Sequence, residues 1–140
     1  MTDIPDASNL LATAREVLLA DILPALPQER RHAALMIANA MAIAAREQRE
    51  GAGALCRETA RLRELLESAG SAAVAATVAA PASRASLPTD PDPLRRRLAE
   101  AIRSGAFDEP PRDAALMDHL ARTSADWTAI SNPKALREPR

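Results

Sequence analysis

Apolar residues recur every three or four positions along most of the chain, which is the spacing of one face of an α-helix. No stretch of useful length alternates apolar with polar residues, so the pattern gives β-strands little support. The periodicity predicts five helices, at about 6–23, 28–50, 54–69, 92–104 and 112–131. The predicted fold class is therefore all-α, a small bundle of about five helices.

The second predicted helix is the most apolar part of the chain. From Ala33 to Ala45 it reads AALMIANAMAIAA, which is apolar on nearly every side and is interrupted by Asn39. A helix that is apolar all round is usually central in its own fold or buried by another subunit. These 13 residues are fewer than the roughly 20 that a membrane-spanning helix needs, so we expect no contact with a membrane.

Capping and stop signals fix the predicted helix ends. Asp6 or Ser8 can cap the first helix, and Asp92 can cap the fourth, with Pro93 in its first turn. Three glycines stand where the predicted helices stop: Gly51, Gly70 and Gly105. One face of the fourth helix is apolar, and we expect it to be buried: Leu94, Leu98, Ala101 and Ile102.

The composition changes to Ala, Ser, Thr, Val and Pro after the third predicted helix, which indicates a linker. We therefore expect a single helical domain over 1–140. Its parts are three helices (6–69), a flexible linker (70–91), two helices (92–133) and a tail (134–140). Alanine is the best helix former, so 71–80 as a further stretch of helix stays an open alternative. The two helices after the linker are too short to be stable alone, and should dock onto the first three.

Charge and cysteine content exclude several classes of function. The formal net charge is −1, so no overall positive field attracts nucleic acid or an anionic membrane. Cys56 is alone, which fits a reducing compartment. The first residues are acidic and no signal-type apolar block follows them. We expect a cytoplasmic protein.

No constellation of residues points to catalysis or metal binding. His32 and His119 are far apart in sequence, and no Cys, His or carboxylate stands at metal-ligand spacing around them. We favour surface or helix-end positions for both histidines. Cys56 has no histidine near it in sequence to activate it. We therefore expect no catalytic residue, no cofactor and no metal.

Four residues are candidate contacts to a ligand or a partner: Asn39, Arg95, Arg96 and Arg103. Asn39 needs hydrogen-bond partners if its apolar helix is buried. A structural bond or a register-setting role across a subunit interface is favoured over a ligand contact. The arginines make one face of the fourth helix basic, which suits phosphate or coenzyme A. A solvated face is the favoured interpretation, because carboxylates stand nearby in sequence.

Three segments carry a resemblance to a known family: VLLADILPALPQERRHAALMIANAMAIAARE, PLRRRLAEAIRSGAFD and LMDHLARTSADWTAISNPKAL. Together they resemble an uncharacterised bacterial family, domain of unknown function 6285. The resemblance implies a gene often found beside those of aminoglycoside-phosphotransferase-like kinases and acyl-CoA dehydrogenases. No catalytic residue is established for the family, and 140 residues of this composition offer no flavin site.

The leading hypothesis for function is a non-catalytic helical accessory or interaction module. Its partner would be phosphotransferase-like or acyl-CoA dehydrogenase-like, as the resemblance implies. The apolar second helix would form the contact, either to that partner or within a homo-oligomer, and no nucleic acid would be bound. The alternative hypothesis is a protein that binds a small molecule or an acyl-CoA-type ligand in a groove near Asn39.

Overall fold

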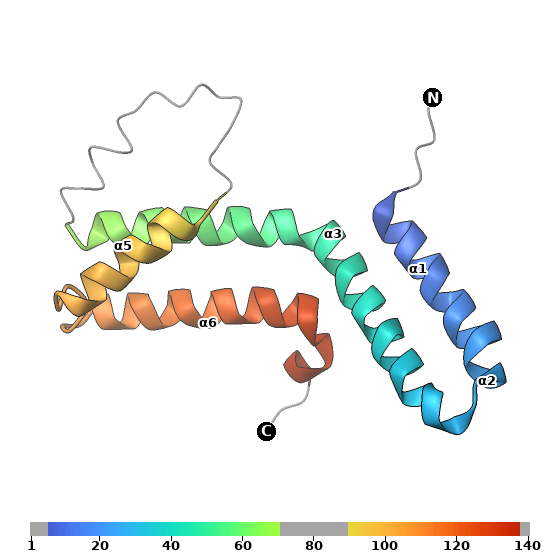
Figure 1. Ribbon diagram of the computed structural model, residues 1–140. Coiled ribbons are helices and arrows are strands. Elements are labelled where there is room, and N and C mark those ends of the chain that lie inside the picture. Colours follow the sequence, from blue (N-terminus) through green and yellow to red (C-terminus); the bar gives the residue numbers. More distant parts are fainter. Residues whose placement is uncertain (1–5, 71–89, 138–140) are drawn as a thin grey trace, which may run out of the picture. The chain divides into compact units, whose positions relative to one another are not determined.

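The computed structural model describes residues 6–70 and 90–137, and the described chain is helical without a strand (Figure 1). The elements are α1 (Ala7–Val17), the π-helical η1 (Leu18–Ile22), α2 (Leu23–Ala25), α3 (Gln28–Ser68), α5 (Asp92–Arg103), α6 (Arg112–Ser131) and the 3-10 turn η2 (Pro133–Leu136). The all-α prediction is confirmed. The number of helices is slightly different: α1, η1 and α2 follow one another without a break over 7–25, so the described residues form four helices and a 3-10 turn rather than about five helices.

The chain divides into two compact units. Unit 1 comprises Met1–Ala52 and Thr128–Arg140, and unit 2 comprises Gly53–Trp127. α3 and α6 each contribute to both units, and each unit is described here by itself. Of the predicted linker at 70–91, residues 71–89 lie outside the described residues, and so does the question whether 71–80 is helical.

α3 is one helix of 41 residues, so the prediction of two helices separated at Gly51 is wrong. Neither Gly51 nor Gly53 has a positive φ, and both continue the helix. A glycine in a helix interior costs about 1 kcal/mol relative to alanine, which is too little to stop a helix held by packing on both sides. The stop at Gly70 is confirmed: this residue has φ +70° and its N–H donates to the Glu67 carbonyl.

The first helical segment begins after Asp6, as predicted, because the Asp6 carboxylate accepts a hydrogen bond from the Ser8 N–H. Near its end the helix widens into the π turn η1, where the Leu23 N–H donates to the Leu18 carbonyl. Pro24 follows directly. A proline ring inside an α-helix clashes with the carbonyl four residues before it, and a wider turn relieves that clash.

Small side chains make the helix contact in unit 1. α1 runs beside the first part of α3 in Figure 1. The buried residues of the two helices here are Ser8, Ala34, Ala38, Ala45 and Gly51. Arg15 adds a hydrogen bond from its Nε to the Ala38 carbonyl, at 3.1 Å. Alanines let two helices approach closely, but they bury little apolar area per residue.

The end of α6 is tied to the middle of α3 within unit 1. Arg46 Nε donates to the Ile130 carbonyl at 2.6 Å, and Arg46 Nη2 donates to the Ser131 carbonyl at 3.4 Å. The last carbonyls of a helix lack intrahelical partners and carry partial negative charge, so a guanidinium is well suited to them. Ile130 is buried, and it is the one large apolar side chain so buried among the described residues of unit 1.

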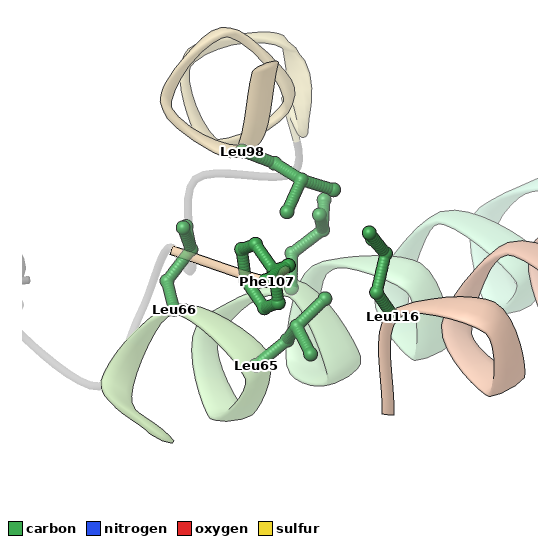
Figure 2. Packing of buried hydrophobic residues seen from close by; sticks show 6 residues of the cluster. Leu65, Leu66, Leu98, Phe107 and Leu116 are labelled. Atoms are coloured by element: carbon green, nitrogen blue, oxygen red, sulfur yellow. The ribbon is translucent and has the colours of Figure 1, made fainter. Parts of the chain in front are cut away.

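Unit 2 has a hydrophobic core of six large side chains: Leu62, Leu65, Leu66, Leu98, Phe107 and Leu116. In Figure 2 the Phe107 ring lies among leucines that come from α3, α5 and α6. Within this unit α5 and α6 pack their leucines against the second part of α3, while the docking of these helices onto all of the first three stays a prediction. The prediction that Ile102 is buried is wrong, because this side chain is exposed.

The start of α5 differs from the prediction, and its end agrees with it. Asp92 was expected to cap the helix, but it is the first helical residue, and its N–H donates to the Asp90 carboxylate instead. The predicted stop at Gly105 is confirmed. Gly105 has φ +79°, its N–H donates to the Ile102 carbonyl, and the Ala106 N–H donates to the Ala101 carbonyl. This pair of bonds is a Schellman motif, which needs a residue with positive φ.

Candidate functional site

Large apolar side chains of unit 1 remain uncovered. Leu35, Met36 and Ile37 of α3 are 49%, 57% and 51% exposed. Successive helix residues point about 100° apart, so these three face different directions away from the buried Ala34 and Ala38. The helix that was predicted to be buried all round is thus covered by its own unit mainly along its alanine face.

The neighbouring helical segment is uncovered in the same way. Leu10 and Val17 of α1 and Ile22 of η1 are exposed as well. We call the following set the apolar surface of unit 1: Leu10, Val17, Ile22, Leu35, Met36 and Ile37. Monomeric proteins rarely leave many large apolar side chains exposed close together, and such areas often mark protein interfaces.

Asn39 is exposed beside this surface. The expectation of a buried amide in need of partners is therefore wrong for the single chain. Asn39 belongs to unit 1, whereas the three candidate arginines belong to unit 2. A ligand contact by Asn39 stays a prediction.

Arg95 is held by carboxylates of its own unit. Its Nε and Nη2 donate to the two carboxylate oxygens of Glu58, each at 2.7 Å, and its Nη1 donates to Asp92 at 2.9 Å. Arg96 and Arg103 lie on the same helix and are exposed. The three arginines therefore differ: the first joins α5 to α3, while the other two face solvent, where a contact to a partner stays a prediction.

Glu58 is a buried carboxylate that the sequence reasoning missed. It is 3% exposed, and the Trp127 side chain hydrogen-bonds it in addition to Arg95. Burial raises the pKa of Glu58, but the hydrogen bonds and charge of Arg95 outweigh burial and bring the pKa below its usual value. The signal was available in part, because Glu58 stands four residues before the buried Leu62 on the same helix face.

His119 is also buried, at 5% exposure, so its assignment to the surface is wrong. His32 is exposed, as expected. His119 Nδ1 has no hydrogen-bond partner among the described residues. Burial lowers the pKa of His119, and the nearby positive charge of Arg61 lowers it further, against smaller opposite effects of Glu58 and Asp118. The side chain is therefore neutral near pH 7.

A shallow cavity of about 250 Å³ opens beside His119. Its lining comes from α3 and α6: Arg61, Glu64, Leu65, Ser68, Ala115, Asp118 and His119. The unpartnered atoms, His119 Nδ1 and Arg61 Nε, are fully covered by protein atoms, so a ligand in the cavity cannot reach them. None of the candidate residues from sequence lines the cavity.

Asp126 joins α6 to α3 through two arginines. Arg57 Nη2 lies 2.9 Å and Arg61 Nη2 lies 2.8 Å from its carboxylate oxygens. Burial raises the pKa of Asp126, but the hydrogen bonds and charges of both arginines outweigh it and bring the pKa below its usual range. These pairs and the Glu58–Arg95 pair stabilise unit 2 from within, and nothing in their geometry points to a reaction.

The remaining chemistry is sparse. Over residues 6–70 and 90–137, no group of three or more His, Cys, Asp and Glu side chains is placed to hold a metal ion. None of the helices in these ranges is long and apolar enough to cross a membrane.

Fold and surface define an all-helical chain with a self-contained core in one unit and an uncovered apolar surface in the other. Residues 24–135 match the family described as domain of unknown function 6285, and the chain belongs to this family. No curated protein and no solved structure is significantly similar to the chain.

Proposed function

We propose that the protein is a non-catalytic helical interaction module, and that the apolar surface of unit 1 is its contact to another polypeptide. The observation that carries the proposal is the half-exposure of Leu35, Met36 and Ile37, three consecutive large apolar side chains in the middle of a long helix. Fully burying such a side chain contributes about 1.5–3 kcal/mol. A partner that covers this surface therefore gains a substantial driving force.

The position of this surface on a helix supports a protein partner. An exposed helix face binds by laying against another helix or into a groove, and residues spaced three and four apart act as its anchors. Methionine is enriched in protein interfaces and adapts to irregular neighbours. Met36 is such a methionine: it is exposed, and it stands between two other exposed apolar residues.

The family resemblance directs the choice of partner. In this proposal the module works in the bacterial cytoplasm with a phosphotransferase-like or an acyl-CoA dehydrogenase-like enzyme. The exposed Arg96 and Arg103 on α5 are further contacts that it can offer to such an enzyme. The enzyme, rather than this chain, would supply the chemistry.

Co-purification tests the proposal. The full chain is tagged and expressed together with a phosphotransferase-like and an acyl-CoA dehydrogenase-like protein from the same genome. We expect one of them to be retained, and we expect Met36→Glu to abolish its retention, because a charge placed in an apolar contact must be desolvated. Met117→Glu is the matched control: Met117 is 59% exposed and lies in unit 2.

Retention of neither enzyme contradicts the proposal, and so does equal loss with both variants. A thermal shift on adding acyl-CoA that disappears in Asn39→Leu would instead favour the alternative function, a binder of acyl-CoA-type ligands near Asn39.

A further inference from the structure

We infer that the polypeptide covering the apolar surface of unit 1 is a second copy of this chain, paired through α3. The inference rests on the proposed function and names the polypeptide at this surface as a second copy, so the enzyme of that proposal would bind the paired chains and would depend on their pairing. The first argument is that unit 1 buries few large apolar side chains. Its described part buries one large apolar side chain, Ile130, while six others on α1, η1 and α3 are exposed. The end of α6 adds only Ile130 to this interior, and stable helical folds place a further element against an exposed apolar side.

The charges around the surface match a copy of itself. From Ala33 to Ala45 the chain has no charged side chain. The flanks of this stretch carry both signs: Glu29, Arg30 and Arg31 before it, and Arg46, Glu47, Arg49 and Glu50 after it. When two such helices cross in antiparallel orientation, the segment before the apolar stretch of one copy lies near the segment after it in the other copy. Both segments contain acidic and basic residues, so no block of like charge meets another. The net charge of −1 leaves little repulsion between whole copies.

Asn39 strengthens the case for an identical partner. It is exposed, and it stands three residues from Met36, so both side chains lie on neighbouring positions of the helix surface. An amide has both a donor and an acceptor, and can therefore hydrogen-bond the same residue of a copy across a twofold axis. A single asparagine in an apolar helix interface commonly sets register in this way.

The resulting arrangement is a familiar one. Met36 points away from the alanine face of α3 that its own unit covers, so the two α3 helices would meet along their outer faces, and twofold dimers are the commonest soluble oligomers. In an isologous interface each residue occurs twice, so Met36 and Asn39 each contribute from both copies. The same surface that one chain leaves open would thus be closed by its own duplicate.

The mass of the purified full chain in solution tests the inference, by sedimentation or by light scattering after size exclusion. We expect twice the 14.9 kDa of one chain. Met36→Glu should halve this mass, because it places a like charge from each copy in the interface. Met117→Glu, the same change at an equally exposed methionine of unit 2, should leave the mass doubled.

A second variant keeps the test decisive if Met36→Glu fails to fold. Ala40→Cys, in a chain that also carries Cys56→Ser, should form a disulfide-linked dimer under mild oxidation, and Met117→Cys in the same background should not. A single-chain mass overturns the inference when it persists up to about 100 µM, where a dimer with a micromolar Kd is already populated. Equal behaviour of the two glutamate variants, or of the two cysteine variants, overturns it as well.

Failure of this inference and failure of the proposed function give different results. A monomer that retains an enzyme, and loses it with Met36→Glu, overturns the second copy and supports the proposed function. A dimer that Met36→Glu dissociates, and that retains neither enzyme, supports the second copy and overturns the enzyme partnership.

Discussion

The two units of this chain bury different kinds of side chain. Unit 2 buries leucines from three helices, a phenylalanine from a loop, a histidine, and a carboxylate that pairs with a half-exposed arginine. Unit 1 buries alanines, a serine and a glycine along α1 and α3, and Ile130 near the end of α6. Since large side chains carry most of the apolar area, unit 2 buries more of this area than unit 1 does, and the proposed contact of unit 1 rests on that difference.

The largest effect that tests this comparison is expected at the centre of unit 2. Phe107→Ala removes the one aromatic ring of the core, and we expect the free energy of unfolding to fall by about 3–5 kcal/mol. Urea denaturation followed by circular dichroism measures this loss. Met117→Ala on the same unit's surface should change it by less than about 0.5 kcal/mol. Similar losses in both variants would contradict a core centred on Phe107.

Glu58 comes next, because it joins α3 to α5 inside unit 2. Glu58→Gln removes the charge that faces Arg95, and we expect a loss of about 1–3 kcal/mol in the free energy of unfolding. Arg95 is half-exposed and keeps its contact with Asp92, which limits the loss. Arg96→Gln, at an exposed position of the same helix, is the control and should be nearly neutral. Equal effects would mean that the pair contributes nothing specific.

Two glycines should respond to alanine with opposite signs. Gly105 has φ +79°, and a Cβ there would lie 2.9 Å from Asp108 Oδ2, so we expect Gly105→Ala to destabilise by about 1–2 kcal/mol. Gly53 is helical and exposed, and its Cβ would meet the flexible end of Arg57. We expect Gly53→Ala to stabilise by about 0.5–1 kcal/mol. Thermal unfolding of both variants checks the signs, and a loss at Gly53 would argue against a continuous α3.

The smallest effect is a dependence of stability on pH. The folded chain holds the pKa of His119 below its usual value of 6.5, because the side chain is buried. As pH falls below about 6.5, the unfolded chain takes up a proton that the folded chain refuses, so the free energy of unfolding decreases. Glu58 and Asp126 have lowered pKa values, and their contribution is lost only at more acidic pH.

Denaturation at pH 7.5 and pH 5.5 measures this dependence. His119→Gln should flatten it, whereas His32→Gln, at an exposed residue of unit 1, should leave it intact. A slope that survives His119→Gln would assign the proton to another group.

Capping and stop residues predicted several helix ends, but they could not predict contacts between residues far apart in the sequence. Asp6, Gly70 and Gly105 act through neighbours within a few residues, so their roles could be predicted from sequence. Gly51 carries the same local signal as Gly105, but packing on both sides keeps it helical. The stop at a glycine therefore depends on whether the chain beyond it has its own contacts.

The candidate site shows the same limit. Glu58 and Arg95 stand 37 positions apart in sequence, and no periodicity links them. His119 could have been suspected, because it follows the buried Leu116 by three residues on one face of α6. The apolar stretch around Asn39 was found from sequence, but whether its own chain covers it depends on the packing of α1, which sequence pattern does not fix.

The bond between Arg46 and the Ile130 carbonyl spans 84 positions of sequence. The two segments of unit 1 are therefore synthesised at different times, with all of unit 2 between them. Until the second segment is made, the first part of α3 lacks its contact with Ile130. A stop codon after Trp127 would consequently leave the leucine and phenylalanine core of unit 2 encoded in full, and would remove from unit 1 the segment that contains Ile130.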